Sequence, residues 1–325
     1  MHLYTKLLRE SAKDAQDSNG RFTMSSEAIE LVEVGPRDGL QNEPEIIPTT
    51  AKLELITRMI GYGARRLEVA SFVHPQRVPQ MADAESVIAA LPDDPACTYI
   101  GLTLNKRGVL RALATREGGR RGVDQIGCVV VASDTFGQKN QGQTIAKGIA
   151  EARAMLRLAR AEGLSAQVTI SAAFGCPFEG AVPHETVLAI AAELAGEAPA
   201  EIALADTIGV GGPSEVGELF GKLSTLLKGS IPMRAHFHDT RGTGIANAWE
   251  AYRAGVRIFD ASLGGLGGCP FAPRATGNIA TEDLVYMMAR AGIATGIDLD
   301  AAIAANKWFA GVLGRELPSA VARAA

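Results

Sequence analysis

The sequence of 325 residues lacks the features that mark two large classes of protein. Its 32 Lys and Arg against 36 Asp and Glu give a net charge of −4, so it has no basic excess with which to bind nucleic acid or an acidic membrane surface. No apolar run approaches the roughly 18 residues that a membrane-spanning helix needs. With 47% hydrophobic and 21% charged residues, the composition indicates a globular protein whose partners are neither nucleic acid nor membrane.

Cysteine is scarce and widely spaced, which excludes a disulfide scaffold and a zinc site of the CxxC kind. The four cysteines are Cys97, Cys128, Cys176 and Cys269. A signal peptide is also missing, because residues 1–27 contain no apolar segment and are too acidic for a typical transit peptide. We therefore expect a cytoplasmic protein in which residues 1–27 form a polar N-terminal extension, with Met24 as a candidate start.

The sequence does contain a regular alternation of strand-like and helix-like segments. Short runs rich in β-branched residues each precede a longer stretch in which apolar residues have helical spacing. The strands that we expect are 29–34, 66–70, 98–104, 125–132, 166–173, 201–206, 233–238 and 257–263. The helices that we expect lie at about 50–61, 81–91, 106–115, 143–162, 184–195, 214–226, 244–254 and 280–292.

This alternation predicts a (β/α)8 TIM barrel, an α/β fold that typically needs about 250 residues. A doubly wound open sheet shows the same alternation, but no Gly-x-Gly-x-x-Gly follows the first strand here. We assign the catalytic TIM-barrel domain to residues 28–292 and a C-terminal helical extension of the same domain to the alanine-rich residues 293–325. No segment resembles a linker between two domains.

The ends of the expected strands carry polar side chains. They are Arg37 and Asp38 after the first strand, Glu68 and Ser71 at the second, Asn105 after the third, Asp206 at the sixth, and His236 and His238 at the seventh. In a TIM barrel the active site is built at the carboxyl ends of the strands, so this clustering indicates an enzyme. The alternative is that polar residues simply mark strand ends, which explains any one of these residues but not the whole set.

The segment AHFHDTRG at the end of the seventh strand offers two imidazoles to one point. Residues two apart on a strand project from the same face, so His236 and His238 can bind one metal ion; alternatively, one is a structural core histidine and the other lies at the surface. Barrel closure places strands 7, 8 and 1 side by side, which brings Asp38 and Asn278 to the same rim. This set suits Mg²⁺ or Mn²⁺ with open positions, while Zn²⁺, Fe²⁺ and Co²⁺ remain conceivable.

The glycine-rich segment LGGLGGCPFAPRATGN, residues 263–278, is the second candidate for chemistry. Four glycines in five residues around Leu266 permit positive φ angles and fit a mobile loop over a site. The thiol of Cys269 could act there as nucleophile or proton donor. Cys176, in the similar context FGCPFEG, is the rival, although its loop is poorer in glycine; we expect Cys97 and Cys128 to be inert.

Six motifs of the chain resemble those of a known enzyme family. In order they are EVGPRDGLQNE, SFVHPQRVPQMAD, FGCPFEG, ADTIGVG, HFHDTRG and GLGGCPFAPRATGN. Over residues 29–292 they resemble 3-hydroxy-3-methylglutaryl-coenzyme A lyases, part of a wider group of metal-dependent barrel lyases and synthases with an Arg-Asp-Gly element on strand 1. The resemblance implies cleavage of a 3-hydroxyacyl-CoA, with a divalent metal, to acetyl-CoA and a ketoacid. In that family the ketoacid is acetoacetate and the context is leucine degradation.

The resemblance also assigns residues to the site. The family's metal ligands match Asp38, His236, His238 and Asn278, and its other catalytic residues match Arg37, Glu68, Asp206 and Cys269. The match favours Cys269 over Cys176, with the thiol protonating the acetyl-CoA carbanion.

The remaining roles follow from the chemistry of carbon–carbon cleavage. Arg37 would stabilise the developing enolate oxygen, and Glu68 and Asp206 would orient Arg37 and the metal ligands. The base that takes the proton from the 3-hydroxyl group is either His236 or Asp38, and the sequence does not choose between them.

Two arginines depart from the family pattern. Arg241 stands where a tyrosine is usual after strand 7, and Arg274 stands where a small residue is usual. Arginine captures carboxylates and phosphates well, so we expect one of them to bind the acyl carboxylate or a CoA phosphate and to shift the acyl preference. Alternatively, both are solvated or paired with carboxylates such as Asp239 and Glu282.

Further contacts and two other functions complete the expectations. Ser71 and Asn105 are candidates for substrate binding, and Lys139 and Asn140 for contact with CoA. A condensing synthase of the same barrel group, and a degenerate barrel that only binds a metal or CoA, are the alternatives to a lyase; neither explains the Gly-Gly-Cys-Pro loop together with an intact ligand set. We expect a homodimer.

Overall fold

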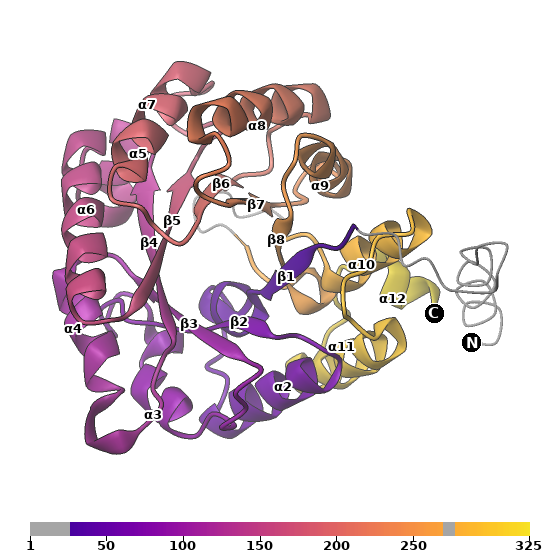
Figure 1. The fold of residues 1–325 in the computed structure, drawn as a ribbon. Helices are drawn as coiled ribbons and strands as arrows, with labels where there is room; N and C mark the ends of the chain where they lie inside the picture. Colours follow the sequence, from indigo (N-terminus) through magenta and orange to yellow (C-terminus); the bar gives the residue numbers. More distant parts are fainter. Residues whose placement is uncertain (1–26, 269–276) are drawn as a thin grey trace, which may run out of the picture.

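The computed structural model describes residues 27–268 and 277–325, and it contains the closed parallel barrel that the alternation predicts. Each strand pairs in parallel with the next one, and β8 pairs with β1 to close the barrel. The strands are β1 (Glu30–Glu33), β2 (Arg66–Ser71), β3 (Thr98–Thr103), β4 (Gln125–Val131), β5 (Ser165–Ser171), β6 (Ile202–Asp206), β7 (Met233–Phe237) and β8 (Ile258–Ala261). Figure 1 shows the helices arranged around these strands.

The helices agree with the expected ones apart from two differences. They are α2 (Thr49–Gly61), α3 (Ala84–Ala89), α4 (Lys106–Ala114), α5 (Asp134–Gln141), α6 (Ile145–Ala161), α7 (His184–Ala195), α8 (Pro213–Leu227), α9 (Gly244–Arg253), α10 (Thr281–Arg290), α11 (Leu299–Leu313) and α12 (Ala320–Ala324). The segment expected as one helix at 81–91 divides into a 3₁₀ turn (Pro79–Met81) and the short α3. Helix α5 was not expected, because its sequence DTFGQKNQ is polar and has no apolar repeat.

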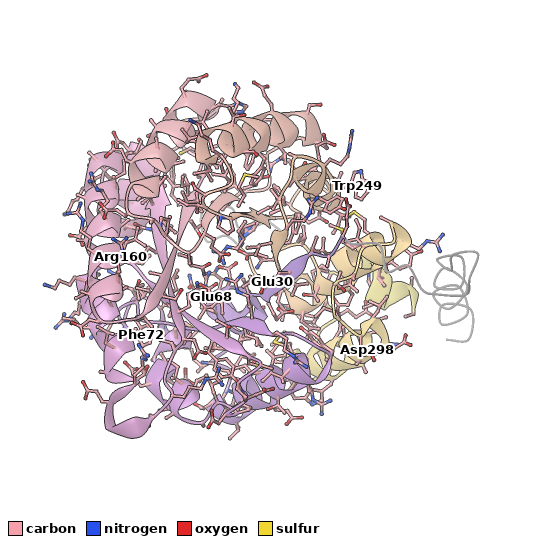
Figure 2. The ribbon with its side chains drawn as sticks, in the orientation of Figure 1. Glu30, Glu68, Phe72, Arg160, Trp249 and Asp298 are labelled. Atoms are coloured by element: carbon pink, nitrogen blue, oxygen red, sulfur yellow. The ribbon has the colours of Figure 1, made fainter. Side chains whose placement is uncertain are left out.

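The two faces of the barrel strands differ in chemistry. On β4, for example, Ile126, Cys128 and Val130 are fully buried on the outer side, whereas Gly127 and Val129 line the cavity inside. The inner face is rich in polar residues, namely Glu30, Arg66, Glu68, Gln125, Gln167, Thr169, Glu201, Arg234, His236 and Asp260. In Figure 2, Glu30 and Glu68 lie near the barrel centre, while Arg160 on α6 and Asp298, just before α11, lie at the outside. Aliphatic layers usually fill this space, so a charged interior indicates a site rather than a packed core.

Two helices, α11 and α12, follow α10 in the segment expected to be helical. Helix α11 packs against α2 and α10, and α12 packs against α10 (Figure 1). The carboxylate of Asp283 fixes the start of α12, because it accepts hydrogen bonds from the Ser319 hydroxyl and from the backbone N–H groups of Ala320 and Val321. Across residues 27–268 and 277–325, no helix is both long and apolar enough to cross a membrane.

Candidate metal centre and active site

A single π-helical turn, Gly35–Gly39, carries Arg37 and Asp38 from the end of β1 into the barrel mouth. The carbonyl oxygen of Val34 accepts the backbone N–H groups of Arg37, Asp38 and Gly39 at 3.2, 2.8 and 3.1 Å, which closes the turn. A Cβ atom added at Gly39 would lie 2.8 Å from the Ser262 hydroxyl oxygen, so only glycine lets the turn pack this closely against the loop after β8. π-turns of this kind occur frequently at functional sites.

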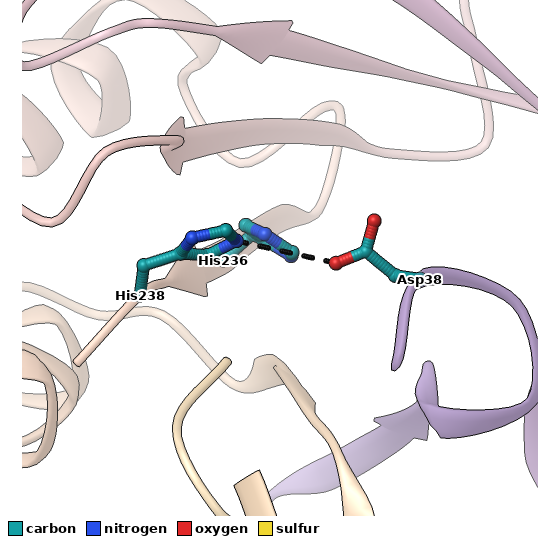
Figure 3. A group of neighbouring side chains, drawn as sticks. All are labelled: Asp38, His236 and His238. Atoms are coloured by element: carbon teal, nitrogen blue, oxygen red, sulfur yellow. Dashed lines mark ion pairs between the residues drawn. The ribbon is translucent and has the colours of Figure 1, made fainter. Parts of the chain in front are cut away.

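The structure brings Asp38, His236 and His238 together as the sequence predicts. Their potential ligand atoms all lie within 4.8 Å of one another, and Figure 3 shows the two imidazoles facing the carboxylate. The Nε2 atom of His238 is 4.0 Å from Oδ2 of Asp38, and the ring centroids of the two histidines are 5.2 Å apart. The three side chains therefore surround a space of the size that one cation occupies.

Asn278 reaches this cluster because the chain returns between the ends of β7 and β8. The Ile279 N–H donates to the Phe237 carbonyl at 3.0 Å, which places residue 278 beside the end of β7. The side-chain Nδ2 of Asn278 donates to Asp38 Oδ2 at 2.8 Å and to the Leu266 carbonyl at 3.0 Å. The amide nitrogen is thus engaged, and the amide oxygen remains available as the fourth ligand atom.

The charges and unpartnered atoms of the cluster fit a divalent cation. Burial opposes ionisation of Asp38, but Arg37 and the two imidazoles outweigh it and hold the pKa of that carboxyl well below its ordinary value. Burial and the neighbouring His236 lower the pKa of His238 to about 4, so that imidazole is neutral near pH 7 and has a lone pair to offer. Oδ1 of Asn278 and Nδ1 of His238 are buried without hydrogen-bond partners among the described residues. One carboxylate, two imidazoles and an amide oxygen form a suitable donor set.

Arg37 is fixed between two carboxylates. Its Nη1 donates to Asp38 Oδ1 at 2.5 Å, and its Nη2 donates to Glu68 Oε2 at 2.6 Å. Burial opposes its charge, but the two carboxylates outweigh burial and raise the pKa of Arg37 above its ordinary value. A permanent cation therefore lies next to Asp38, His236 and His238, and Glu68 holds it by a hydrogen bond.

Asp206 bonds to backbone groups and not to Arg37, the partner expected from the sequence. Its two carboxylate oxygens accept the backbone N–H groups of Val210 and Gly211, both at 2.9 Å. It makes no hydrogen bond with Arg37 in the part of the chain that the structure describes. The side chain shapes the loop after β6, because a fully buried carboxylate close to its own strand end satisfies the nearest backbone donors.

A cavity of about 810 Å³ opens at the carboxyl end of the barrel beside this cluster. Its walls include the cluster residues Asp38, His236 and His238, together with Arg37, Glu68, Gln41, Asn42, His74, Arg77, Asn105, Lys139, Asn140, Arg234, Asp260 and Gly268. Of the residues expected to contact substrate or CoA, some line this cavity and others do not. Asn105, Lys139 and Asn140 line the cavity, although the Asn105 side chain also caps α4 by accepting the Gly108 N–H at 3.0 Å.

Ser71 is not among the lining residues. It is fully buried, and its hydroxyl oxygen accepts the N–H of Val73 at 3.3 Å. This contact supports the backbone after β2, so the structure gives Ser71 a local role instead of the expected contact with substrate.

Arg241 also differs from the expectation. Its Nη1 donates to the carbonyl oxygens of Ile208 and Gly209 at 3.0 and 2.8 Å, so it braces the loop after β6 and does not line the cavity. Asp239 and Glu282, the carboxylates considered as partners, bond elsewhere: the former to Gly244 N–H and the latter to Gly264 N–H. The partners of Arg241 are backbone carbonyl oxygens, which every residue carries and which no sequence pattern can therefore identify.

Cys176 is held in a structural role. Its sulfur accepts hydrogen bonds from the Ser133 hydroxyl at 3.0 Å and from the N–H groups of Phe178 and Glu179 at 3.3 and 3.4 Å. These contacts tie the loop after β5 to the start of α5. Burial raises the pKa of the Cys128 thiol to about 12, which supports the expectation that this cysteine takes no part in chemistry.

The expected roles of Cys269 and Arg274 fall on residues outside those that the structure describes. Both flanks of that segment are close to the site. Gly268 lines the cavity and accepts a hydrogen bond from Asn42 Nδ2 at 2.7 Å, and Asn278 holds Asp38. The role of Cys269 therefore stays a prediction.

Sequence reasoning missed Asp260, whose Oδ2 is 3.0 Å from Nδ1 of His236. A signal was present, since Asp260 is a charged residue inside the apolar run IFDA of β8. Arg234, two residues before His236 on the same face of β7, gave the same kind of signal. Both residues line the cavity below the ligand cluster.

Comparisons with known proteins identify the family of this chain. The HMGL-like family model matches residues 28–308. The chain is 42% identical over 308 residues to (R)-citramalyl-CoA lyase of Chloroflexus aurantiacus (92% of this chain, 95% of the relative), and 40% identical over 278 residues to hydroxymethylglutaryl-CoA lyase of Pseudomonas mevalonii (85% and 89%). A solved HMG-CoA lyase from Acinetobacter baumannii, in complex with coenzyme A and 3-methylmalate, superimposes with a TM-score of 0.86 at 37% identity, covering 93% of this chain and 96% of that one. The chain belongs to the HMGL-like family.

Proposed function

We propose that this chain, a carbon–carbon lyase of the HMGL-like family, uses a divalent cation to cleave a 3-hydroxyacyl-CoA that also carries an acyl carboxylate. The products are acetyl-CoA and a ketoacid. The observation that carries the proposal is the convergence of Asp38, His236 and His238 beside the fixed cation Arg37 on the wall of one cavity. The donor set favours Mg²⁺ or Mn²⁺, held by these three residues and the amide oxygen of Asn278.

The residues of the chain divide the reaction between them. A bound divalent cation would lower the pKa of the substrate 3-hydroxyl group, so that a weak base is enough to remove its proton. Of the two candidate bases, Asp38 accepts that proton when the bond between C2 and C3 breaks, because Asp260 and the cation would engage both ring nitrogens of His236. Arg37, positioned by Glu68, stabilises the enolate oxygen of the departing acetyl-CoA, and Cys269 returns a proton to its carbon.

Two acyl groups are candidates, because the relatives are named for two substrates. Citramalyl-CoA has one methylene less between the carbinol carbon and the carboxylate than 3-hydroxy-3-methylglutaryl-CoA, so cleavage would give pyruvate instead of acetoacetate. We propose 3-hydroxy-3-methylglutaryl-CoA as the substrate, which the 40% identity to its lyase supports. Citramalyl-CoA is the alternative, which the 42% identity to the citramalyl-CoA lyase supports. Arg77 and Lys139 on the cavity wall supply positive charge suited to the phosphates of coenzyme A.

One assay tests the reaction, the metal and the acyl group together. Release of acetyl-CoA is measured with both acyl-CoAs, using protein treated with a chelator and verified free of metal, with and without added Mg²⁺ or Mn²⁺. We expect no turnover without metal, restored turnover with it, and a difference in kcat/KM between the two substrates. A condensing synthase would instead consume acetyl-CoA in the presence of a ketoacid. Full activity of the metal-free protein would contradict the assigned ligands, and His236→Ala should lose both metal and activity.

A further inference from the structure

The barrel interior beneath the metal ligands holds four residues of alternating charge, which we name the interior charge line: Glu201, Arg234, Asp260 and His236. Nη1 of Arg234 lies 3.6 Å from Oε1 of Glu201 and 3.5 Å from Oδ1 of Asp260. Oδ2 of Asp260 lies 3.0 Å from Nδ1 of His236. All four side chains are buried, and the line ends at one of the ligands of the proposed cation.

The pairing of β7 with β8 explains this arrangement. Arg234 pairs with Ile258 and Ala235 with Phe259, so the next position of β7, His236, lies beside Asp260. Arg234 and His236 are two residues apart on one strand and project from the same face into the barrel. Asp260 can therefore contact both of them from the neighbouring strand. The contact follows from strand register and needs no loop to form it.

The contact between Asp260 and His236 determines which imidazole nitrogen is free. An ionised carboxylate only accepts hydrogen bonds, so Nδ1 of His236 must be the donor. The proton of the neutral imidazole then resides on Nδ1, and the lone pair resides on Nε2. The ring is thereby held in the tautomer that can bind a cation through Nε2, and its rotation is restricted.

Arg234 in turn orients Asp260. It faces the other oxygen of the carboxylate, and its own position is fixed by a hydrogen bond from Nη2 to the Thr169 hydroxyl at 2.9 Å. Its positive charge favours the ionised form of Asp260. His238 has no equivalent support, since its Nδ1 is buried without a hydrogen-bond partner among the described residues. The two histidine ligands are therefore unequal.

We propose that Asp260 is a positioning residue for the metal centre, which fixes His236 in the tautomer and orientation that bind the cation, while Arg234 fixes Asp260. This inference rests on the metal-dependent function proposed above. Asp260 contacts neither the cation nor the substrate in this role, and acts through His236 alone. Carboxylate partners of this kind typically contribute about 10- to 100-fold to metal affinity.

The first test reads the tautomer directly in the unmodified protein. The chain has only five histidines, so NMR of protein labelled with ¹⁵N at histidine gives few signals, and comparison with the His236→Gln variant assigns the one of interest. The spectrum is recorded on metal-free protein at alkaline pH, where the imidazole is neutral. We expect the proton on Nδ1 of His236. A proton on Nε2 would overturn the proposal.

The second test measures metal affinity with a matched control. Asp260→Asn removes the charged acceptor next to His236, whereas Glu201→Gln removes a buried carboxylate from the other side of Arg234 without contact to His236. Isothermal titration calorimetry of the metal-free proteins with Mn²⁺ measures the Mn²⁺ affinity. We expect this affinity to fall about 10- to 100-fold in Asp260→Asn and to change less than about 3-fold in Glu201→Gln.

The outcomes separate this inference from the function on which it rests. Equal affinities of wild type and Asp260→Asn, or equal losses in Asp260→Asn and Glu201→Gln, would overturn the positioning role. Absence of Mn²⁺ binding by the wild-type protein would overturn the proposed metal-dependent function instead. If Asp260→Asn fails to fold, the tautomer of wild-type His236 still decides the question.

Discussion

At the scale of single residues, the guanidinium of Arg37 is held by two carboxylates on different elements of the barrel. Asp38 follows it in the same turn, and Glu68 projects from β2. Two different nitrogens make these two bonds, which requires the planar fork of arginine. The sequence placed Arg37 at the end of β1, but the second carboxylate partner is a consequence of the pairing between β1 and β2.

We predict that Arg37→Lys lowers kcat by about 10²-fold or more, because a single ammonium cannot contact both carboxylates and also face the enolate oxygen. Steady-state kinetics at saturating metal measures the change, and Mn²⁺ affinity should stay close to the wild-type value. Arg157→Lys is the matched control, since Arg157 lies on the outer helix α6 and pairs with Glu197. A variant that retains full turnover would show that Arg37 does not take part in the chemistry.

We predict opposite effects for the two cysteines. Cys269→Ala should reduce kcat by about 10²-fold, the usual scale for a positioned proton donor, with little change in metal content. Cys176→Ala should instead lower the free energy of unfolding, because it removes the sulfur that accepts three hydrogen bonds. Turnover and urea unfolding are measured for both variants. The reverse pattern would assign the chemistry to the loop after β5.

At the scale of secondary-structure elements, Glu33 of β1 connects the parts that build the site. Its Oε1 accepts the N–H groups of Gly35 and Leu263, at 2.9 and 3.0 Å, and its Oε2 accepts the Tyr62 and Thr281 hydroxyls at 2.5 and 2.7 Å. Gly35 belongs to the π-turn that carries Arg37, and Leu263 begins the loop that precedes Cys269 in the sequence. One buried carboxylate therefore fixes both segments relative to β1.

We predict that Glu33→Ala destabilises the fold by about 3 kcal/mol or more, because each buried donor left unpaired costs about 1–3 kcal/mol. Glu33→Gln should cost much less, since its amide can still accept the backbone N–H groups and donate to the two hydroxyls. Urea unfolding of both variants gives the two values. Equal losses would mean that the negative charge, and not the hydrogen bonds, holds the turn and the loop together.

At the scale of the whole molecule, a second buried carboxyl links stability to pH. Glu282 on α10 is fully buried, accepts hydrogen bonds from Gly264 N–H and Asn306 Nδ2, and has no ion-pair partner among the described residues. Burial, with a smaller contribution from the neighbouring Glu33, raises the pKa of Glu282 to about 8. In the unfolded chain its pKa returns to about 4.5.

We predict that Glu282 makes the protein less stable as the pH rises from about 4.5 to about 8. In that window the native protein retains a proton at Glu282 that the unfolded chain has released, so the free energy of unfolding falls by about 1 kcal/mol per pH unit. Urea unfolding of the wild type and Glu282→Gln at pH 5 and pH 8 isolates this effect. The free energy of unfolding of the variant, relative to the wild type, should be higher at pH 8 than at pH 5. The same difference between the two proteins at both pH values would show that Glu282 is ionised in the native state.

Local patterns in the sequence were sufficient to predict the barrel and the shared direction of two histidines at its rim. The alternation of strand and helix depends on hydrophobic periodicity within windows of 4 to 17 residues, and this periodicity can be recognised without knowledge of any tertiary contact. The shared direction of His236 and His238 follows from their spacing of two residues on β7. Closure of eight strands then put Asp38 beside them, as the order of strands around a barrel requires.

The partners of individual side chains were decided only by the tertiary structure. Asp206 and Arg241 have the right residue types at the right rim, yet the nearest backbone groups engage them. Asp260 gave only a weak signal in the sequence, but the register of β8 against β7 places it on His236. The physical reason is that a hydrogen bond forms or fails over about an ångström, whereas a sequence pattern determines which face a side chain occupies and not its distance to another strand. The sequence by itself therefore determined the barrel and the kind of site, and the tertiary structure decided which charged residues act in it and which support the fold.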